Sequence, residues 1–244
     1  MKRFLACLAA LLAAAPALGG NFGVSPIRVD LNRETKSAVL TIKNDDVRPL
    51  AFQVRGVRWT QDASGADRYE PTTDIVYFPQ QLRIPPGESR VVRVGYKVPA
   101  IEAEQAFRVY IEELAEGGSE RSGTGVAIRL RFGVPVFLHP VKENLAGELA
   151  LSVRQGEADA LVHNNGNVHL RITAVRLTGV GKDGEAVFQH VVDGWYLLDG
   201  NQRSHRFRLP PEACAKARVL RAEVVTEEKL ALRSEQPLGP QDCD

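Results

Sequence analysis

The sequence lacks most of the features that mark an enzyme, a metalloprotein or a membrane protein. Beyond residue 20, no stretch approaches the about eighteen apolar residues that a membrane-spanning helix needs. The Walker loop, the G-x-S-x-G nucleophile elbow and the H-E-x-x-H zinc motif are all absent. Neither half has convincing helical periodicity. We therefore expect a soluble, non-enzymatic protein that uses no metal, cofactor or small-molecule substrate.

Residues that could carry chemistry are few and scattered. His163 and His169 are six residues apart, but no cysteine or carboxylate cluster completes a metal site at a recognisable spacing. We expect exposed or half-buried strand histidines there. Glu112 and Glu113 are adjacent in a β-rich run, so their side chains point to opposite faces and cannot share an acid–base task.

The N-terminus has the pattern of an export signal. A basic start at Lys2 and Arg3 is followed by an apolar segment over residues 4–15 and by small residues at 17–19. This pattern predicts a secretory signal peptide over residues 1–19 and a protein that is exported.

Charge and cysteine content constrain the exported chain. Loss of Lys2 and Arg3 reduces the 31 basic residues to 29, against 30 acidic ones, a net charge of −1. No global charge therefore draws the protein to nucleic acid or to an anionic membrane. Two cysteines remain, and an even pair in an exported chain predicts a disulfide between Cys214 and Cys243.

Strand patterns fill both halves of the chain. The first half has seven β-rich runs separated by turn signals: FGVSPIRVDL, SAVLTIKND, LAFQVRGVRW, DIVYF, SRVVRVGYKV, FRVYIEELA and VAIRLRFGVPVF. Seven short strands in about 120 residues are typical of an immunoglobulin-like sandwich. A second, similar series follows, with a hairpin turn expected at Lys182–Gly184. The prediction is an all-β protein of two tandem immunoglobulin-like β-sandwich domains, over residues 20–140 and 141–244.

The last run of the first domain is the most amphipathic. From Val126 to Phe132, apolar residues alternate with Arg129 and Arg131, after the loose, polar segment EGGSERSGTG. Two interpretations are open. The apolar face fills the domain's own core, or the strand is an edge that adds to another protein's sheet.

Several stretches resemble a known family. FGVSPIRVDL, VYFPQQLRIPPGESRVVRV and AIRLRFGVPVFLHP are similar to the periplasmic pilus chaperones of the chaperone–usher pathway, which are PapD-like. The fit is best to the archaic branch, with spore-coat-U-type subunits. The resemblance implies a boomerang of two domains in the periplasm. It also implies donor-strand complementation, in which the chaperone lends a strand to an incomplete pilus subunit. The lent side chains would be Val126, Ile128, Leu130 and Phe132.

The resemblance also implies an anchor for the subunit's C-terminal carboxylate. In the family two basic residues hold it in the interdomain cleft, and the first corresponds to Arg28. The second is normally a lysine, but its position here is Pro135, so Arg131 is the substitute candidate and Arg108 the next. An arginine fork suits a carboxylate.

The implied partners are pilus or fimbrial subunits and an outer-membrane usher. The exposed strand could also pair with the same strand of a second copy, which would give a self-capping homodimer. An alternative is a secreted adhesive or structural pilus subunit with two immunoglobulin-like domains. A subunit should lack one strand, whereas the first half of this chain has a full set of seven runs.

Overall fold

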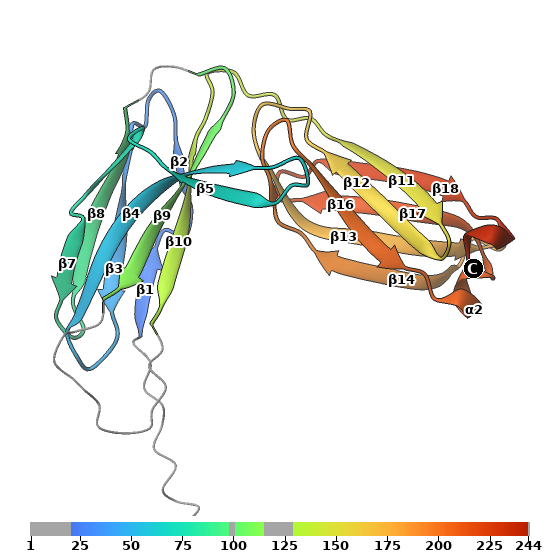
Figure 1. The fold of residues 1–244 in the computed structure, drawn as a ribbon, viewed down its shortest axis with the longest axis horizontal. Helices are drawn as coiled ribbons and strands as arrows, with labels where there is room; N and C mark the ends of the chain where they lie inside the picture. Colours follow the sequence, from blue (N-terminus) through green and yellow to red (C-terminus); the bar gives the residue numbers. More distant parts are fainter. Residues whose placement is uncertain (1–20, 98–100, 115–128, 244) are drawn as a thin grey trace, which may run out of the picture.

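The computed structural model of the protein describes residues 21–97, 101–114 and 129–243, so the predicted signal peptide lies outside the described residues. Strands dominate, and they form two sandwiches that meet at an angle and give a bent molecule (Figure 1). The strands of the first sandwich end at Leu138 and those of the second begin at Glu148. None of the helices in this part of the chain has the length and apolar content that a membrane span requires.

The first sandwich has two sheets. One has the strand order β1–β3–β8–β6, and the other has β2–β10–β9–β4–β5, with β7 paired to β4. The strands are β1 (Phe22–Ser25), β2 (Val29–Leu31), β3 (Ser37–Asn44), β4 (Leu50–Gln61), β5 (Asp67–Pro71), β6 (Ile75–Phe78), β7 (Gln81–Ile84), β8 (Ser89–Tyr96), β9 (Gln105–Glu113) and β10 (Arg131–Leu138). Alternate residues of these strands face each other in one apolar core, including Leu40, Ile42, Phe52, Val92, Val109 and Val134.

The run predicted as one N-terminal strand is two strands in different sheets. Strand β1 pairs with β3, whereas β2 pairs in parallel with β10. The chain changes sheets around Pro26, which has no backbone N–H to donate to a ladder. This change of sheet places Arg28 directly before β2, next to the end of β10.

Strand β4 is longer than predicted and has an unpredicted partner. Its second half pairs with β5, and the hairpin reaches the second domain (Figure 1). The sequence of β5 is DRYEP, which is mostly exposed and lacks alternation of apolar and polar residues. The pattern that identified the other strands is therefore absent from it.

The second sandwich has the strand orders β11–β12–β16 and β14–β13–β17–β18, with β15 paired to β13. The elements are β11 (Glu148–Arg154), β12 (Glu157–His163), β13 (Leu170–Gly181), β14 (Ala186–Asp193), β15 (Tyr196–Leu197), β16 (Gln202–Arg208), α2 (Pro211–Cys214), β17 (Ala217–Thr226), β18 (Ala231–Pro237) and the 3-10 turn η2 (Pro240–Asp242). The predicted hairpin turn joins β13 to β14, with Gly184 at φ 82°. The predicted disulfide between Cys214 and Cys243 is confirmed, with 5.7 Å between the two Cα atoms.

A small apolar cluster joins the two domains. Trp59 and Phe137 of the first domain pack with Leu198 of the second. Next to it, the Gln61 side chain donates to the Tyr196 carbonyl and accepts from the Leu198 N–H, both at 2.9 Å. These contacts join the outer face of β4, β9 and β10 to the second domain.

Candidate functional site

The amphipathic run of the first domain contains strand β10. Within the described residues β10 starts at Arg131, so Leu130 lies just before the strand. The Leu130 carbonyl still accepts a hydrogen bond from the Glu113 N–H, at 3.1 Å, so contact with β9 includes it. Val126 and Ile128, which were predicted to lie on the same face, are outside the described residues.

The apolar face of this strand emerges from the domain's own core. Val134 and Val136 are 0% exposed and pack inside the first sandwich. Leu130 and Phe132 continue the same row, since they alternate with them, but are 40% and 37% exposed. The end of the strand therefore fills the domain's own core, as the first interpretation predicts, and its beginning leaves that core. The second interpretation, addition to another protein's sheet, stays a prediction.

The start of β10 also has a free backbone edge. Strand β2 pairs with β10 only at residues 136–138, and the His139 N–H donates to Leu31, so odd-numbered residues face that side. In the described part of the chain no strand pairs with this side of β10 before residue 136. The N–H and C=O groups of Arg131 and Gly133 therefore point to an open edge.

Arg28 lies at the other end of β10, in the interdomain cleft. Its Nε donates to Asp30 Oδ2 at 3.0 Å, and its Nη1 donates to Glu227 Oε1 of the second domain at 2.9 Å. A cavity of about 390 Å³ opens there, lined by residues of both domains that include His139, Glu143, Val168 and Glu228. The Arg28 side chain keeps 35% of its surface exposed.

The charges around Arg28 stabilise one another. Burial works to lower the pKa of Arg28, but Asp30 and Glu227 outweigh it and the pKa is raised. Burial likewise works to raise the pKa of Asp30, but a hydrogen bond with His139 and the charge of Arg28 outweigh it and the pKa is lowered. Arg28 and Asp30 are therefore held in their charged forms.

Arg131 and Arg28 are not brought together. The β2–β10 register, continued by one residue, places Arg28 beside Pro135, and Arg131 is four residues away, about 13 Å along the strand. Arg131 instead donates from Nε to Glu112 at 2.8 Å and lies over the ring of Tyr110 at 3.6 Å.

Arg108, the second candidate, is much nearer. It is the β9 partner of Pro135, so Arg28, Pro135 and Arg108 form a row across three strands, with about 10 Å between the outer two Cα atoms. Its side chain is 9% exposed, and its buried Nε and Nη2 have no hydrogen-bond partner in the described part of the chain. Its guanidinium lies over the rings of Trp59 (4.3 Å), Trp195 (5.6 Å) and Tyr69 (5.7 Å).

Sequence reasoning missed the buried polar contact between the domains. His169 was expected to be an exposed or half-buried strand histidine, but it lies just before β13 and is 6% exposed. Its Nδ1 lies 2.8 Å and 3.0 Å from the two oxygens of Glu104, whose side chain is 1% exposed. His139 Nδ1 lies 3.4 Å from the same carboxylate. Nothing in the sequence around Glu104 signals this burial, because a residue 65 positions away creates it.

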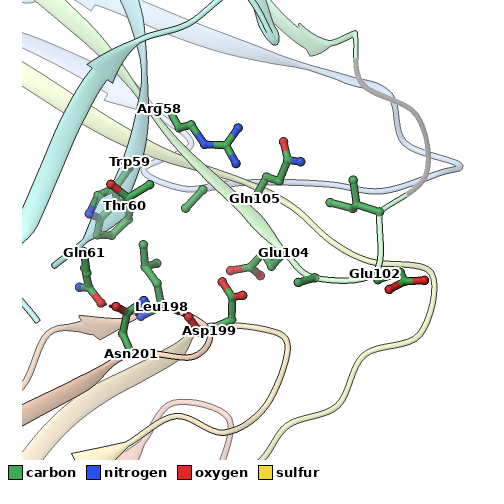
Figure 2. Close-up of a pocket in the computed structure, with 13 residues that line it drawn as sticks. Arg58, Trp59, Thr60, Gln61, Glu102, Glu104, Gln105, Leu198, Asp199 and Asn201 are labelled. Carbon is green, nitrogen blue, oxygen red and sulfur yellow. Dashed lines mark hydrogen bonds between the residues drawn. The ribbon is translucent and has the colours of Figure 1, made fainter. Parts of the chain in front are cut away.

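A second cavity, of about 520 Å³, is lined by Glu104 and by Asp199 of the second domain (Figure 2). Figure 2 shows the carboxylates of Glu104 and Asp199 facing each other from the two domains. Burial and the charge of Glu104 raise the pKa of Asp199. Neither Arg28 nor β10 lines this cavity, so it is separate from the residues that the sequence singled out.

Comparisons with known proteins agree with this architecture. Residues 21–143 match the family model described as "Pili and flagellar-assembly chaperone, PapD N-terminal domain". The probable fimbrial chaperone EcpB of Escherichia coli O157:H7 (strain EC4115 / EHEC) is 26% identical over 227 residues, which cover 90% of this chain and 95% of EcpB.

Solved structures share the fold. One is a chain from the crystal structure of the CsuC–CsuE chaperone–tip adhesion subunit pre-assembly complex, from archaic chaperone–usher Csu pili of Acinetobacter baumannii. It is 18% identical, with a TM-score of 0.62, and the match covers 88% of this chain and 97% of that one. The YadV chaperone is 15% identical, with a TM-score of 0.61 and coverage of 89% and 99%.

Proposed function

Because the chain belongs to the family of PapD-type pilus and flagellar-assembly chaperones, we propose that it binds pilus subunits in the periplasm by donor-strand complementation. In this proposal the start of β10 completes the subunit's sheet, the interdomain cleft holds the subunit's C-terminal carboxylate, and the complex is delivered to an outer-membrane usher. The function is binding without catalysis.

The observation that carries the proposal is the row of apolar side chains that leaves the core. Leu130 and Phe132 each have more than a third of their surface still to bury. Complete burial of such a side chain contributes about 1.5–3 kcal/mol, so the exposed 40% of Leu130 would contribute about 0.6–1.2 kcal/mol inside a subunit groove. A groove in a subunit that lacks a strand is the kind of partner that accepts this row.

The open edge supplies the second part of the interaction. The backbone groups of Arg131 and Gly133 are available to hydrogen-bond an added strand, and such bonds give β-augmentation much of its affinity. The CsuC–CsuE structure, which has the same fold, is a chaperone–tip adhesion subunit pre-assembly complex. We infer the same class of partner for this chain.

For the carboxylate we propose Arg28 together with Arg108. Both lie on the cleft side of the sheet, one strand away from Pro135 on either side, whereas Arg131 lies about 13 Å further along β10. Nε and Nη2 of Arg108 have no hydrogen-bond partner in the described part of the chain, so its guanidinium still has donors to offer. A carboxylate between two guanidiniums gains charge-assisted hydrogen bonds from both.

Delivery to an usher requires a surface that stays free when a subunit occupies β10. The outer face of the sheet β1–β3–β8–β6 is such a surface, because it belongs to the sheet that does not contain β10. It has a group of exposed apolar side chains on neighbouring strands: Val39, Val76, Phe78 and Val91. Exposed apolar groups of this kind mark contact surfaces.

The test compares substitutions along one strand. Leu130→Asp and Phe132→Asp should abolish recovery of subunit from periplasm while lowering the melting temperature by only a few degrees, because these side chains are partly outside the core. Val134→Asp should unfold the domain itself, since it buries an unpaired charge.

Val191→Asp is the matched control. Val191 is a 53% exposed valine on β14 of the second domain, so its change adds the same charge away from the site and should preserve capture. Normal capture by both the Leu130 and Phe132 variants, or their outright unfolding, would show that the start of β10 is not a donor strand.

A further inference from the structure

Arg28 already holds a carboxylate of the second domain. We propose that Glu227 occupies the ligand position of Arg28 in the free chaperone and competes with the subunit's carboxylate, which makes Glu227 a residue that sets the affinity of capture. This inference depends on the proposed role of Arg28 as carboxylate anchor.

The two carboxylates bound to Arg28 differ in how easily they can be replaced. Asp30 is only two residues from Arg28 in the chain, and its other oxygen lies 3.0 Å from His139 Nε2. Glu227 follows the end of β17, is about half exposed, and Arg28 is the only side chain that bonds its carboxylate in the described part of the chain. Asp30 therefore orients the guanidinium, and Glu227 is the replaceable ligand.

The guanidinium leaves one edge for a bidentate partner. Its Nε is taken by Asp30, so two parallel hydrogen bonds to a carboxylate are possible only through Nη1 and Nη2. Glu227 accepts from Nη1 through a single oxygen. An incoming carboxylate that uses both nitrogens displaces Glu227 and makes one hydrogen bond more than Glu227 does.

Displacement also breaks a contact between the domains. Arg28 precedes β2 in the first domain and Glu227 lies 199 residues later in the second. The freed Glu227 shares the cavity with Glu143 and Glu228, whose charges do not favour its return. Capture of a subunit is thereby linked to release of one ion pair between the domains.

The experiment is a competition for limiting subunit. Differently tagged wild-type and Glu227→Gln chaperones are co-expressed with the subunit that co-purifies with the wild type. We expect the subunit to partition toward Glu227→Gln by about two- to fivefold, the range set by partly exposed ion pairs. Equal partition would overturn the inference.

Two further variants separate the causes. Glu228→Gln removes the same charge from the same cavity, but Glu228 bonds the Arg171 N–H and not Arg28, so it should shift the partition less than Glu227→Gln. An equal shift would mean that both carboxylates only repel the subunit's carboxylate and that Glu227 does not compete with it for Arg28. Arg28→Ala should lose the competition with wild type. If it does not, the proposed anchor itself fails, which is a different result from failure of Glu227→Gln alone.

Discussion

The buried contact between Glu104 and His169 joins the two domains, and His169→Ala tests how much it contributes to stability. The His169 ring contacts both carboxylate oxygens of Glu104, and the backbone N–H of His169 donates to Oε1 at 3.2 Å. The ring also stacks on Phe137, with 3.7 Å between the ring centroids. Both side chains are almost fully buried. The substitution removes the nearest partner of a carboxylate that water cannot reach.

The expected cost follows from that burial. Removal of the partner of a buried polar group costs about 1–3 kcal/mol, because the remaining group stays desolvated and loses its hydrogen bonds. For a chain of this size, about 1 kcal/mol corresponds to about 2–4 °C in melting temperature, so we expect a fall of about 2–12 °C. Glu104→Gln should cost less, because the amide still hydrogen-bonds and the repulsion from Asp199 disappears.

The assay is thermal unfolding followed by circular dichroism at pH 6 and pH 8.5. Burial works to lower the pKa of His139, but Asp30, Glu104 and Glu143 outweigh it and the pKa is raised above 6.5. A histidine with a raised pKa stabilises the fold below its unfolded pKa, and this stabilisation is lost as pH rises through the folded value. Burial lowers the pKa of His205, which contributes in the opposite sense over the same range. The contribution of His139 is therefore measured as a difference: the fall in melting temperature from pH 6 to pH 8.5 should be larger for the wild type than for His139→Gln.

His163→Ala is the matched control, since His163 is half-buried in β12 and makes no side-chain hydrogen bond in the described part of the chain. It should change the melting temperature by only a few degrees. If His169→Ala melts within about two degrees of the wild type, or no lower than His163→Ala, the contact with Glu104 does not hold the domains.

Three further predictions concern other parts of the chain. Arg108→Ala should reduce recovery of subunit per folded chaperone more than Arg131→Ala does, and the reverse order would return the anchor to Arg131. Asp199→Asn should raise the melting temperature at pH 7, because it removes a carboxylate whose pKa is raised in the folded protein. The gain should vanish below about pH 4, where aspartate is protonated in the unfolded chain as well. Reduction of Cys214–Cys243, 29 residues apart, should cost about 3–4 kcal/mol of stability in denaturant titrations, and thiol counting on the unfolded, unreduced protein should find no free thiol.

Period-two patterns predicted most of the fold, because most strands have one buried and one exposed face. Strand β10 is an example: its alternation is visible in the sequence, and Val134 and Val136 are buried as alternation requires. The pattern fails for β5, which is exposed on both faces and lies in a hairpin held by the second domain. A strand stabilised by partners distant in sequence has no need of an amphipathic pattern.

The site shows the same limit. The family resemblance predicted Arg28 as the first anchor and put Arg131 ahead of Arg108 as the second, and these roles stay predictions. Strand pairing places Arg108 nearer to Pro135 than Arg131 is. Neighbouring strands are about 4.8 Å apart, whereas four residues along one strand span about 13 Å. Glu104 was missed because its burial depends on the second domain.

The residues proposed to contact a subunit share one physical property: within this chain their burial or their hydrogen bonding is incomplete. Leu130 and Phe132 are partly buried, and Arg131 and Gly133 have hydrogen-bonded neighbours on one side of the strand only. Arg28 is held by the carboxylate of Asp30, which also contacts His139, and by the half-exposed Glu227 of the other domain. Complete satisfaction would leave nothing for a partner to add, and complete exposure would favour self-association through an apolar edge. With partial burial and partial hydrogen bonding, the free chaperone stays folded, and a subunit can still add burial or hydrogen bonds at each of these residues.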